Sequence, residues 1–98
     1  MSSLSEMEKA LAFPAIDHET RREMLSYLKI YGPMTHENLA KEYNLAIESY
    51  LHHINMLLCG NLVEYTHDDY PFVDTMKRRI RISKTGDSVL SLLDKGKS

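Results

Sequence analysis

The chain has 98 residues, the length of one domain, and a domain of this size can bury one compact core. Hydrophobic residues make up 43% of it, which excludes a chain that is mainly disordered. The formal net charge of -2 excludes a general nucleic-acid coat protein, so any DNA binding depends on a local basic patch.

The cysteine content and the hydropathy indicate a cytoplasmic protein. Cys59 is the only cysteine, so no intrachain disulfide is possible, which suits a reducing compartment. No apolar run approaches the ~20 residues that span a membrane. Residues 1–11 lack the basic start and the apolar stretch of a secretory signal. We therefore expect a cytoplasmic localisation and no membrane partner.

Two helices are predicted before the first glycine. Leu4, Met7 and Leu11 form one apolar stripe of an N-terminal helix within residues 1–13. Its expected cap is Ser3 or Ser5, and Pro14 marks its end. A second helix is expected to start at an N-cap residue, Asp17, and to stop at Gly32 and Pro33.

Two further helices follow with a short turn between them. Thr35 is a good N-cap for the third helix, and Asn44 suits a left-handed C-terminal cap. The fourth helix is predicted from Ile47 to Cys59. The residues expected on or near its buried stripe are Ile47, Tyr50, Leu51, Ile54, Leu57 and Leu58.

After Gly60 the hydrophobic period changes to that of strands. Residues 62–66 contain good strand formers, residues 67–75 read as a loop, and residues 76–83 alternate with Ile80 and Ile82 on one face. Ser83 or Thr85 then caps a last helix over residues 84–95. We therefore predict a single α+β domain over residues 1–98, mainly α, with a two-stranded β-hairpin wing and flanking terminal helices.

This order of elements and several short motifs are similar to the winged helix-turn-helix regulators of the ArsR and MarR types, especially small archaeal ones. In the predicted helix-turn-helix, Asn44 stands where these families usually have glycine, and Ala46 where a Ser or Thr cap is common. The other matching pieces are Leu39-Ala40, His53-Ile54 with Leu57, Asn61-Leu62-Val63 and Ser83-Lys84-Thr85-Gly86. The resemblance implies a homodimer that binds double-stranded DNA and regulates transcription, with repression as the default.

The resemblance makes the fourth helix the recognition helix. Its outward face has no Lys or Arg, although these residues, with Asn and Gln, lead most base contacts. Glu48 would repel phosphate unless it accepts a hydrogen bond from a cytosine amine. The predicted DNA-binding residues of this helix are Glu48, Ser49, His52, His53 and Asn55.

Basic residues gather on the second strand of the wing. Five of the twelve Lys and Arg residues lie within residues 77–84. The resemblance implies phosphate or minor-groove contacts by Lys77, Arg78, Arg79, Arg81 and Lys84. The alternative is a solvated strand face on which Arg79 or Arg81 pairs with Glu64 across the hairpin. At the wing tip, Asp68, Asp69 and Asp74 would be repelled by DNA.

Metal binding and catalysis have little support in the sequence. His52 and Cys59 are the best candidate pair of ligands, but two ligands do not complete a tetrahedral site. There is no glycine-rich phosphate loop, and Cys59 on a leucine-rich helix reads as a core residue or a bystander. We therefore expect no metal, no cofactor and no enzymatic activity.

The terminal helices are the predicted dimer interface. The resemblance implies that residues 1–13 and 84–95 pair across a two-fold axis on the side away from DNA, through Leu4, Met7, Leu11, Val89, Leu90 and Leu93. In the alternative, the N-terminal helix covers its own core and the protein is a monomer. A different function also stays open: winged helices serve as protein–protein docking modules that do not touch DNA.

Overall fold

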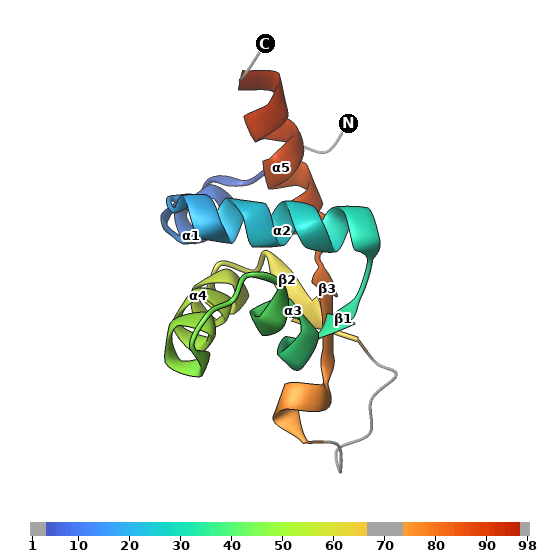
Figure 1. Ribbon diagram of the computed structural model, residues 1–98. Helices are drawn as coiled ribbons and strands as arrows, with labels where there is room; N and C mark the ends of the chain where they lie inside the picture. Colours follow the sequence, from blue (N-terminus) through green and yellow to red (C-terminus); the bar gives the residue numbers. More distant parts are fainter. Residues whose placement is uncertain (1–3, 67–73, 97–98) are drawn as a thin grey trace.

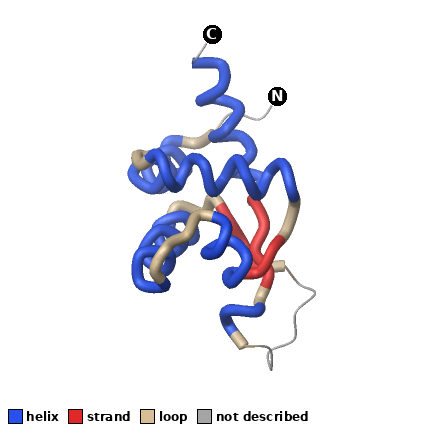
Figure 2. Tube along the Cα trace, viewed as in Figure 1, coloured by secondary structure: helices blue, strands red, loops and turns tan. Residues whose placement is uncertain are grey.

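The computed structural model describes residues 4–66 and 74–96, and it is mainly helical, as predicted (Figures 1 and 2). The elements run in the order expected of a winged helix, with two additions, β1 and the 3-10 turn η1. They are α1 (Glu6–Ile16), α2 (Glu19–Tyr31), β1 (Met34–Thr35), α3 (His36–Glu42), α4 (Ile47–Cys59), β2 (Val63–Tyr65), η1 (Thr75–Lys77), β3 (Arg79–Ile82) and α5 (Lys84–Gly96).

The sheet has three antiparallel strands in the order β1-β3-β2, one more than the predicted hairpin. Val63 pairs with Ile82, and Tyr65 pairs with Ile80, which is fully buried. The additional strand, β1, pairs Met34 with Ile80 on the other side of β3. A strand of two residues, the second of which is also the cap of α3, is too short to show an alternating pattern, so the sequence gives no signal for it.

The helices end close to the predicted residues because a cap depends on the backbone conformation and hydrogen bonds of residues that are near in sequence. Gly32 has φ 84° and Asn44 has φ 50°, and both end a helix as expected. Thr35 Oγ1 accepts from the Asn38 amide at 3.1 Å, and Ser83 Oγ accepts from the Gly86 amide at 2.9 Å. The predicted cap Asp17 is wrong. His18 caps α2 instead, its Nδ1 accepting from the Thr20 amide at 3.1 Å.

The first helix does not end at Pro14 but continues to Ile16. Proline in a helix removes one hydrogen bond, so continuing the helix requires other stabilisation. The buried side chains of Ala12, Ala15 and Ile16 supply it by packing against the rest of the core. The apolar contacts of this helix are therefore concentrated in its second half rather than on the predicted stripe.

Gly60 lets α1 approach the end of α4. A Cβ added at Gly60 would lie 2.7 Å from Ala15 Cβ and 3.1 Å from the Leu11 carbonyl oxygen. The backbone of Gly60 is in the ordinary right-handed region, at φ -78°, so alanine would add no backbone strain, and its cost would come from these close contacts alone.

We expect Gly60→Ala to lower the free energy of unfolding by about 1–3 kcal/mol, the usual cost of overpacking. Urea denaturation followed by circular dichroism measures it. Asn61→Gly, at the next position and at φ 60°, is a control that should cost little. Gly60→Ala as stable as wild type would show that α1 is not packed there.

Candidate nucleic-acid interface

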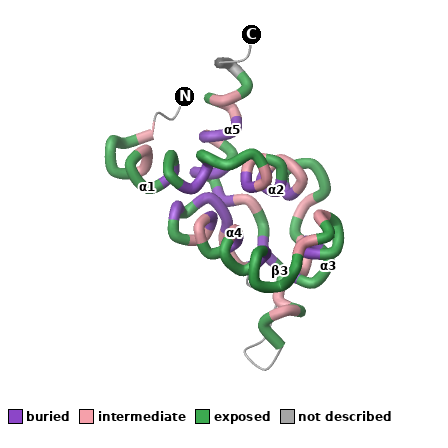
Figure 3. The backbone as a smooth tube through the Cα atoms, turned by 60° about the vertical axis from the view of Figure 1, so that its left-hand side comes forward, coloured by how far each residue is buried: buried purple, intermediate pink, exposed green. Residues whose placement is uncertain are grey.

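The outward face of α4 presents the polar residues predicted for it. Glu48, Ser49, His52 and Asn55 are exposed, whereas Tyr50, Ile54 and Leu57 are buried in the core. Figure 3 shows this division of α4 into exposed and buried positions. The helix therefore offers one solvent-facing strip with carboxylate, hydroxyl, imidazole and amide groups.

His53 does not belong to this strip, although it was predicted with it. Arg21 Nη1 donates to His53 Nδ1 at 3.3 Å, and the His18 ring lies 4.7 Å from the His53 ring. Burial, followed by the neighbouring His18 and Arg21, lowers the pKa of His53. One residue along a helix is a turn of about 100°, and that step takes the side chain from the exposed strip to the junction with α2.

Arg21 explains why that junction is polar. It is 7% exposed, and its Nε donates to the Ala15 carbonyl at 2.6 Å. Arg22 Nη1 donates to the Ile16 carbonyl at 2.9 Å. These two side chains satisfy carbonyls at the C-terminus of α1, where cations are favoured. They are structural, and the sequence pattern did not distinguish them from surface arginines.

The basic residues of the wing divide into two groups along β3. Lys77, Arg78 and Arg79 lie at the η1 end, on the same side of α2 as α4 (Figure 1). Lys84 begins α5, which extends on the other side of α2. Lys77, Arg79, Arg81 and Lys84 are exposed, and Arg78 is half-buried.

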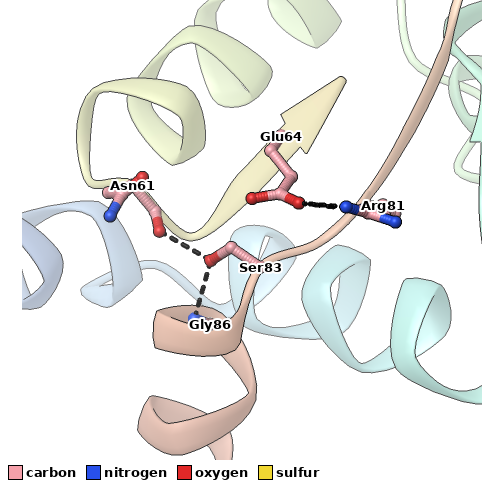
Figure 4. A network of polar contacts seen from close by, with 5 residues as sticks. All are labelled: Asn61, Glu64, Arg81, Ser83 and Gly86. Atoms are coloured by element: carbon pink, nitrogen blue, oxygen red, sulfur yellow. Dashed lines mark hydrogen bonds and ion pairs between the residues drawn. The ribbon is translucent and has the colours of Figure 1, made fainter. Parts of the chain in front are cut away.

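Arg81 pairs with Glu64 on β2, as the alternative interpretation of the sequence predicted (Figure 4). Its Nε and Nη2 lie 2.8 and 2.7 Å from Glu64 Oε2. The carboxylate offsets the charge of Arg81, which weakens its case for a phosphate contact. Ser83 Oγ donates to the Asn61 carbonyl at 2.7 Å beside this pair.

Of the acidic residues at the wing, Asp74 is described. It is exposed, and its side chain accepts from the Met76 amide at 3.3 Å, so it caps η1. His67, Asp68 and Asp69 lie outside the described residues, and the predicted repulsion of DNA by the wing tip stays a prediction.

A buried polar cluster behind α4 was not predicted. His36 is 1% exposed, and its two ring nitrogens lie 2.5 Å from Tyr50 Oη and 2.9 Å from Tyr65 Oη. The Arg78 guanidinium carbon lies 4.1 Å from the centroid of the Tyr65 ring. A histidine directly after a cap residue looks like a surface residue in the sequence, so only the tertiary contacts identify its role.

The terminal helices leave part of their apolar surface uncovered. Met7 is 73% exposed and Leu11 is 50% exposed on α1, and Leu92 is 47% exposed on α5. Leu4 and Leu93 are half-buried against the core. The two helices are in contact, and Thr85 Oγ1 donates to Glu8 Oε2 at 3.3 Å.

Val89 and Leu90 were predicted to lie in a dimer interface, but they belong to the core of the chain itself. They are 0% and 5% exposed. The 3.6-residue period identifies the apolar stripe of α5, yet it does not say whether the stripe meets its own chain or another one. Leu92, beside this stripe, is the exposed leucine of α5.

The described residues contain no group of three or more His, Cys, Asp or Glu side chains placed to hold a metal ion. Cys59 is exposed at the end of α4. Within residues 4–66 and 74–96, none of the helices is long and apolar enough to cross a membrane.

Solved structures with the same fold include transcriptional regulators. An ArsR family transcriptional regulator superposes with a TM-score of 0.68 at 24% identity, over 98% of this chain and 93% of that one. A homodimeric winged helix-turn-helix DNA-binding domain from Mycobacterium bovis, a possible ArsR-family regulator, superposes with a TM-score of 0.72 at 18% identity, over 97% and 88%. Mutant MarR from E. coli complexed with operator DNA superposes with a TM-score of 0.67 at 13% identity, over 92% and 65%.

Neither a family model nor a curated protein matches the sequence. The structural similarity confirms the winged-helix fold and the resemblance of this fold to ArsR and MarR regulators.

Proposed function

We propose that the protein is a non-enzymatic transcriptional regulator, in the role of a repressor, that binds double-stranded DNA sequence-specifically as a homodimer. The observation that carries the proposal is that α4, with its exposed polar strip, and the basic η1 end of β3 lie on the same side of α2 (Figure 1). A strip that reads bases and a basic segment that binds phosphate are the two components of a DNA interface.

In this proposal α4 enters the major groove, which is wide enough to admit an α-helix. Asn55 is the strongest base reader of the strip, because a side-chain amide pairs with adenine through two hydrogen bonds. Ser49 and His52 lie on the same exposed strip. Glu48 accepts from a cytosine amine, the role that avoids its repulsion by phosphate.

The contacts to the DNA backbone come from the η1 end of β3. Lys77 and Arg79 are exposed there, and Arg78 lies over the Tyr65 ring. Arg81 and Lys84 have a smaller role in the proposal, since Arg81 is paired with Glu64 and Lys84 lies at the start of α5. This division supports three phosphate-binding side chains in each protomer rather than five.

A homodimer is supported by the exposed leucine and methionine side chains of α1 and α5. One module of this size makes few contacts, but two recognition helices about one DNA turn apart reach successive major grooves. The domain from Mycobacterium bovis with the same fold is homodimeric. Repression follows when a dimer on its operator excludes other proteins.

Asn55→Ala tests sequence-specific binding. Duplexes are first selected by the wild-type protein from a random pool. We expect the variant to bind a selected site more weakly by about 1–3 kcal/mol, with little change on random DNA, because base contacts specify and phosphate contacts position. Asn38→Ala, also at an exposed asparagine but on α3, is the matched control. Equal losses on both DNAs would exclude Asn55 as a base reader.

A protein–protein docking module is the second candidate function. It is favoured by Ile47 and Leu51, which are 47% and 38% exposed at the start of α4, and by the lack of Lys and Arg on that helix. A docking module would bind no DNA at any salt concentration, so DNA binding itself separates the two functions.

A further inference from the structure

A series of buried polar contacts connects α4, the proposed recognition helix, to the wing base, by which we mean Tyr65 on β2 and Arg78 before β3. It starts at Tyr50, which is fully buried in α4, passes through His36 at the first turn of α3, and reaches Tyr65 on β2. The His36 ring meets both tyrosine rings edge-on, with centroids 5.6 and 5.4 Å apart. Three elements that are distant in sequence are therefore joined through one imidazole.

The series of contacts ends at Arg78. Besides the stacking of Arg78 on Tyr65, the backbone amide of His36 donates to the Arg78 carbonyl at 3.3 Å. Arg78 Nε is buried and has no hydrogen-bond partner among the described residues. His36 thus contacts the backbone of Arg78 directly, and it is linked to the side chain of Arg78 through Tyr65.

We infer that His36 is a positioning residue for DNA binding, whose ring hydrogen bond to Tyr65, together with its backbone bond to Arg78, holds the wing base at a fixed place against α3. The inference rests on the proposed function. In the hydrogen-bonded part of the network, from Tyr50 through His36 to Tyr65, both ring nitrogens and both hydroxyls have a partner, and the loss of one bond leaves a buried polar group unpaired. Loss of the bond between His36 and Tyr65 therefore releases the wing base while α4 keeps its own core contacts.

Burial favours the neutral form of the His36 imidazole. In that form one ring nitrogen donates to one tyrosine hydroxyl and the other nitrogen accepts from the second. The titratable or charged groups that face His36 are Tyr50 from α4, Tyr65 from β2 and Arg78 from the wing base. Burial, and secondly the charge of Arg78, lower the pKa of His36 below its ordinary value of 6.5.

The lowered pKa of His36 determines how folding stability changes with pH. The unfolded chain binds a proton at His36 more readily than the folded chain, so folding stability falls as the pH drops below about 6.5. Protonation also places a second positive charge beside Arg78 in this buried cluster, which disfavours the packed wing base. The effect of His36 is measured as a ratio of affinities between variants, so that pH effects common to all variants cancel.

Two substitutions of His36 separate its two bonds. Glutamine places its amide near the position of Nε2 and keeps the bond to Tyr65, whereas asparagine is shorter and keeps only a group near Nδ1, toward Tyr50. Neither side chain titrates. At neutral pH we expect His36→Gln to bind DNA like wild type and His36→Asn to bind about threefold to tenfold more weakly, the effect of one lost hydrogen bond.

Tyr65→Phe removes the hydroxyl and keeps the ring beneath Arg78, so it is a second test that does not disturb the core. We expect a similar loss of affinity, and no further loss when it is combined with His36→Asn, because both remove the same bond. Tyr31→Phe, on a tyrosine that is 66% exposed on α2, is the matched control and should bind like wild type.

Binding is measured by fluorescence anisotropy with a selected duplex between pH 5.5 and pH 8, on variants that circular dichroism shows to be folded. The affinity of wild type relative to His36→Gln is expected to fall toward the acid end. Amide hydrogen exchange at Arg78 and Arg79 without DNA should be faster in His36→Asn than in His36→Gln. Equal affinities of all variants, when wild type binds DNA, would overturn the inference alone. A wild-type protein that binds no DNA would overturn the proposed function and this inference with it.

Discussion

Leu11→Asp together with Leu92→Asp is expected to convert the proposed homodimer to a monomer and to weaken DNA binding by about 10²–10⁴-fold, because the second recognition helix is then no longer tethered to the first. Both leucines are about half exposed within one chain, so the charges disturb its own core little. In a dimer interface the same charges would be buried without partners, which is strongly unfavourable.

Sedimentation equilibrium at micromolar concentration measures the mass, and anisotropy measures the affinity. Ile30→Asp is the matched control, since Ile30 is 71% exposed on α2 beside Tyr27, outside the proposed interface. It should leave both mass and affinity unchanged. If the double variant keeps the mass of the wild-type protein, the dimer is not formed by α1 and α5.

Lys77→Ala together with Arg79→Ala is expected to produce the largest change in the salt dependence of binding. Each lost phosphate contact lowers the slope of log affinity against log salt by about 0.9, so two lost contacts in each protomer lower it by about 1.8 per protomer. The selected and the random duplex should weaken alike, since phosphate contacts carry no sequence information.

The control is the other basic pair of the same strand, Arg81→Ala with Lys84→Ala. It removes the same formal charge, but at the end of β3 nearer α5 and with Arg81 already paired to Glu64. We expect its slope to stay close to that of wild type. An equal reduction by both pairs would mean that net charge, and not position at the wing base, determines the slope.

The parts of the fold that were predictable are those with local causes. Gly32, Asn44 and Ser83 end or start helices through their own backbone and side-chain chemistry, and the structure places all three at helix ends. The ion pair of Arg81 with Glu64 was also predictable, because residues at directly opposite positions of a hairpin interact. The winged-helix order followed from these local signals and from the resemblance.

The parts that were not predictable depend on tertiary contacts. Helix α1 continues past Pro14 because Ala15 packs against the core, and Val89 is buried by its own chain rather than by a partner. His53 contacts Arg21 at the junction with α2, and His36 lies in the core between two tyrosines. A sequence pattern identifies which face of an element is apolar, but it does not identify the element that packs against that face. Each of these errors concerns such a packing partner.

Binding of double-stranded DNA by this winged helix is tested by titrating a labelled generic duplex with the wild-type protein at low salt and again at physiological salt. We expect binding at low salt that weakens steeply as salt is added, since phosphate contacts release counterions. An absence of binding at low salt, with the protein folded, would rule out the DNA-binding function and leave the docking module as the function.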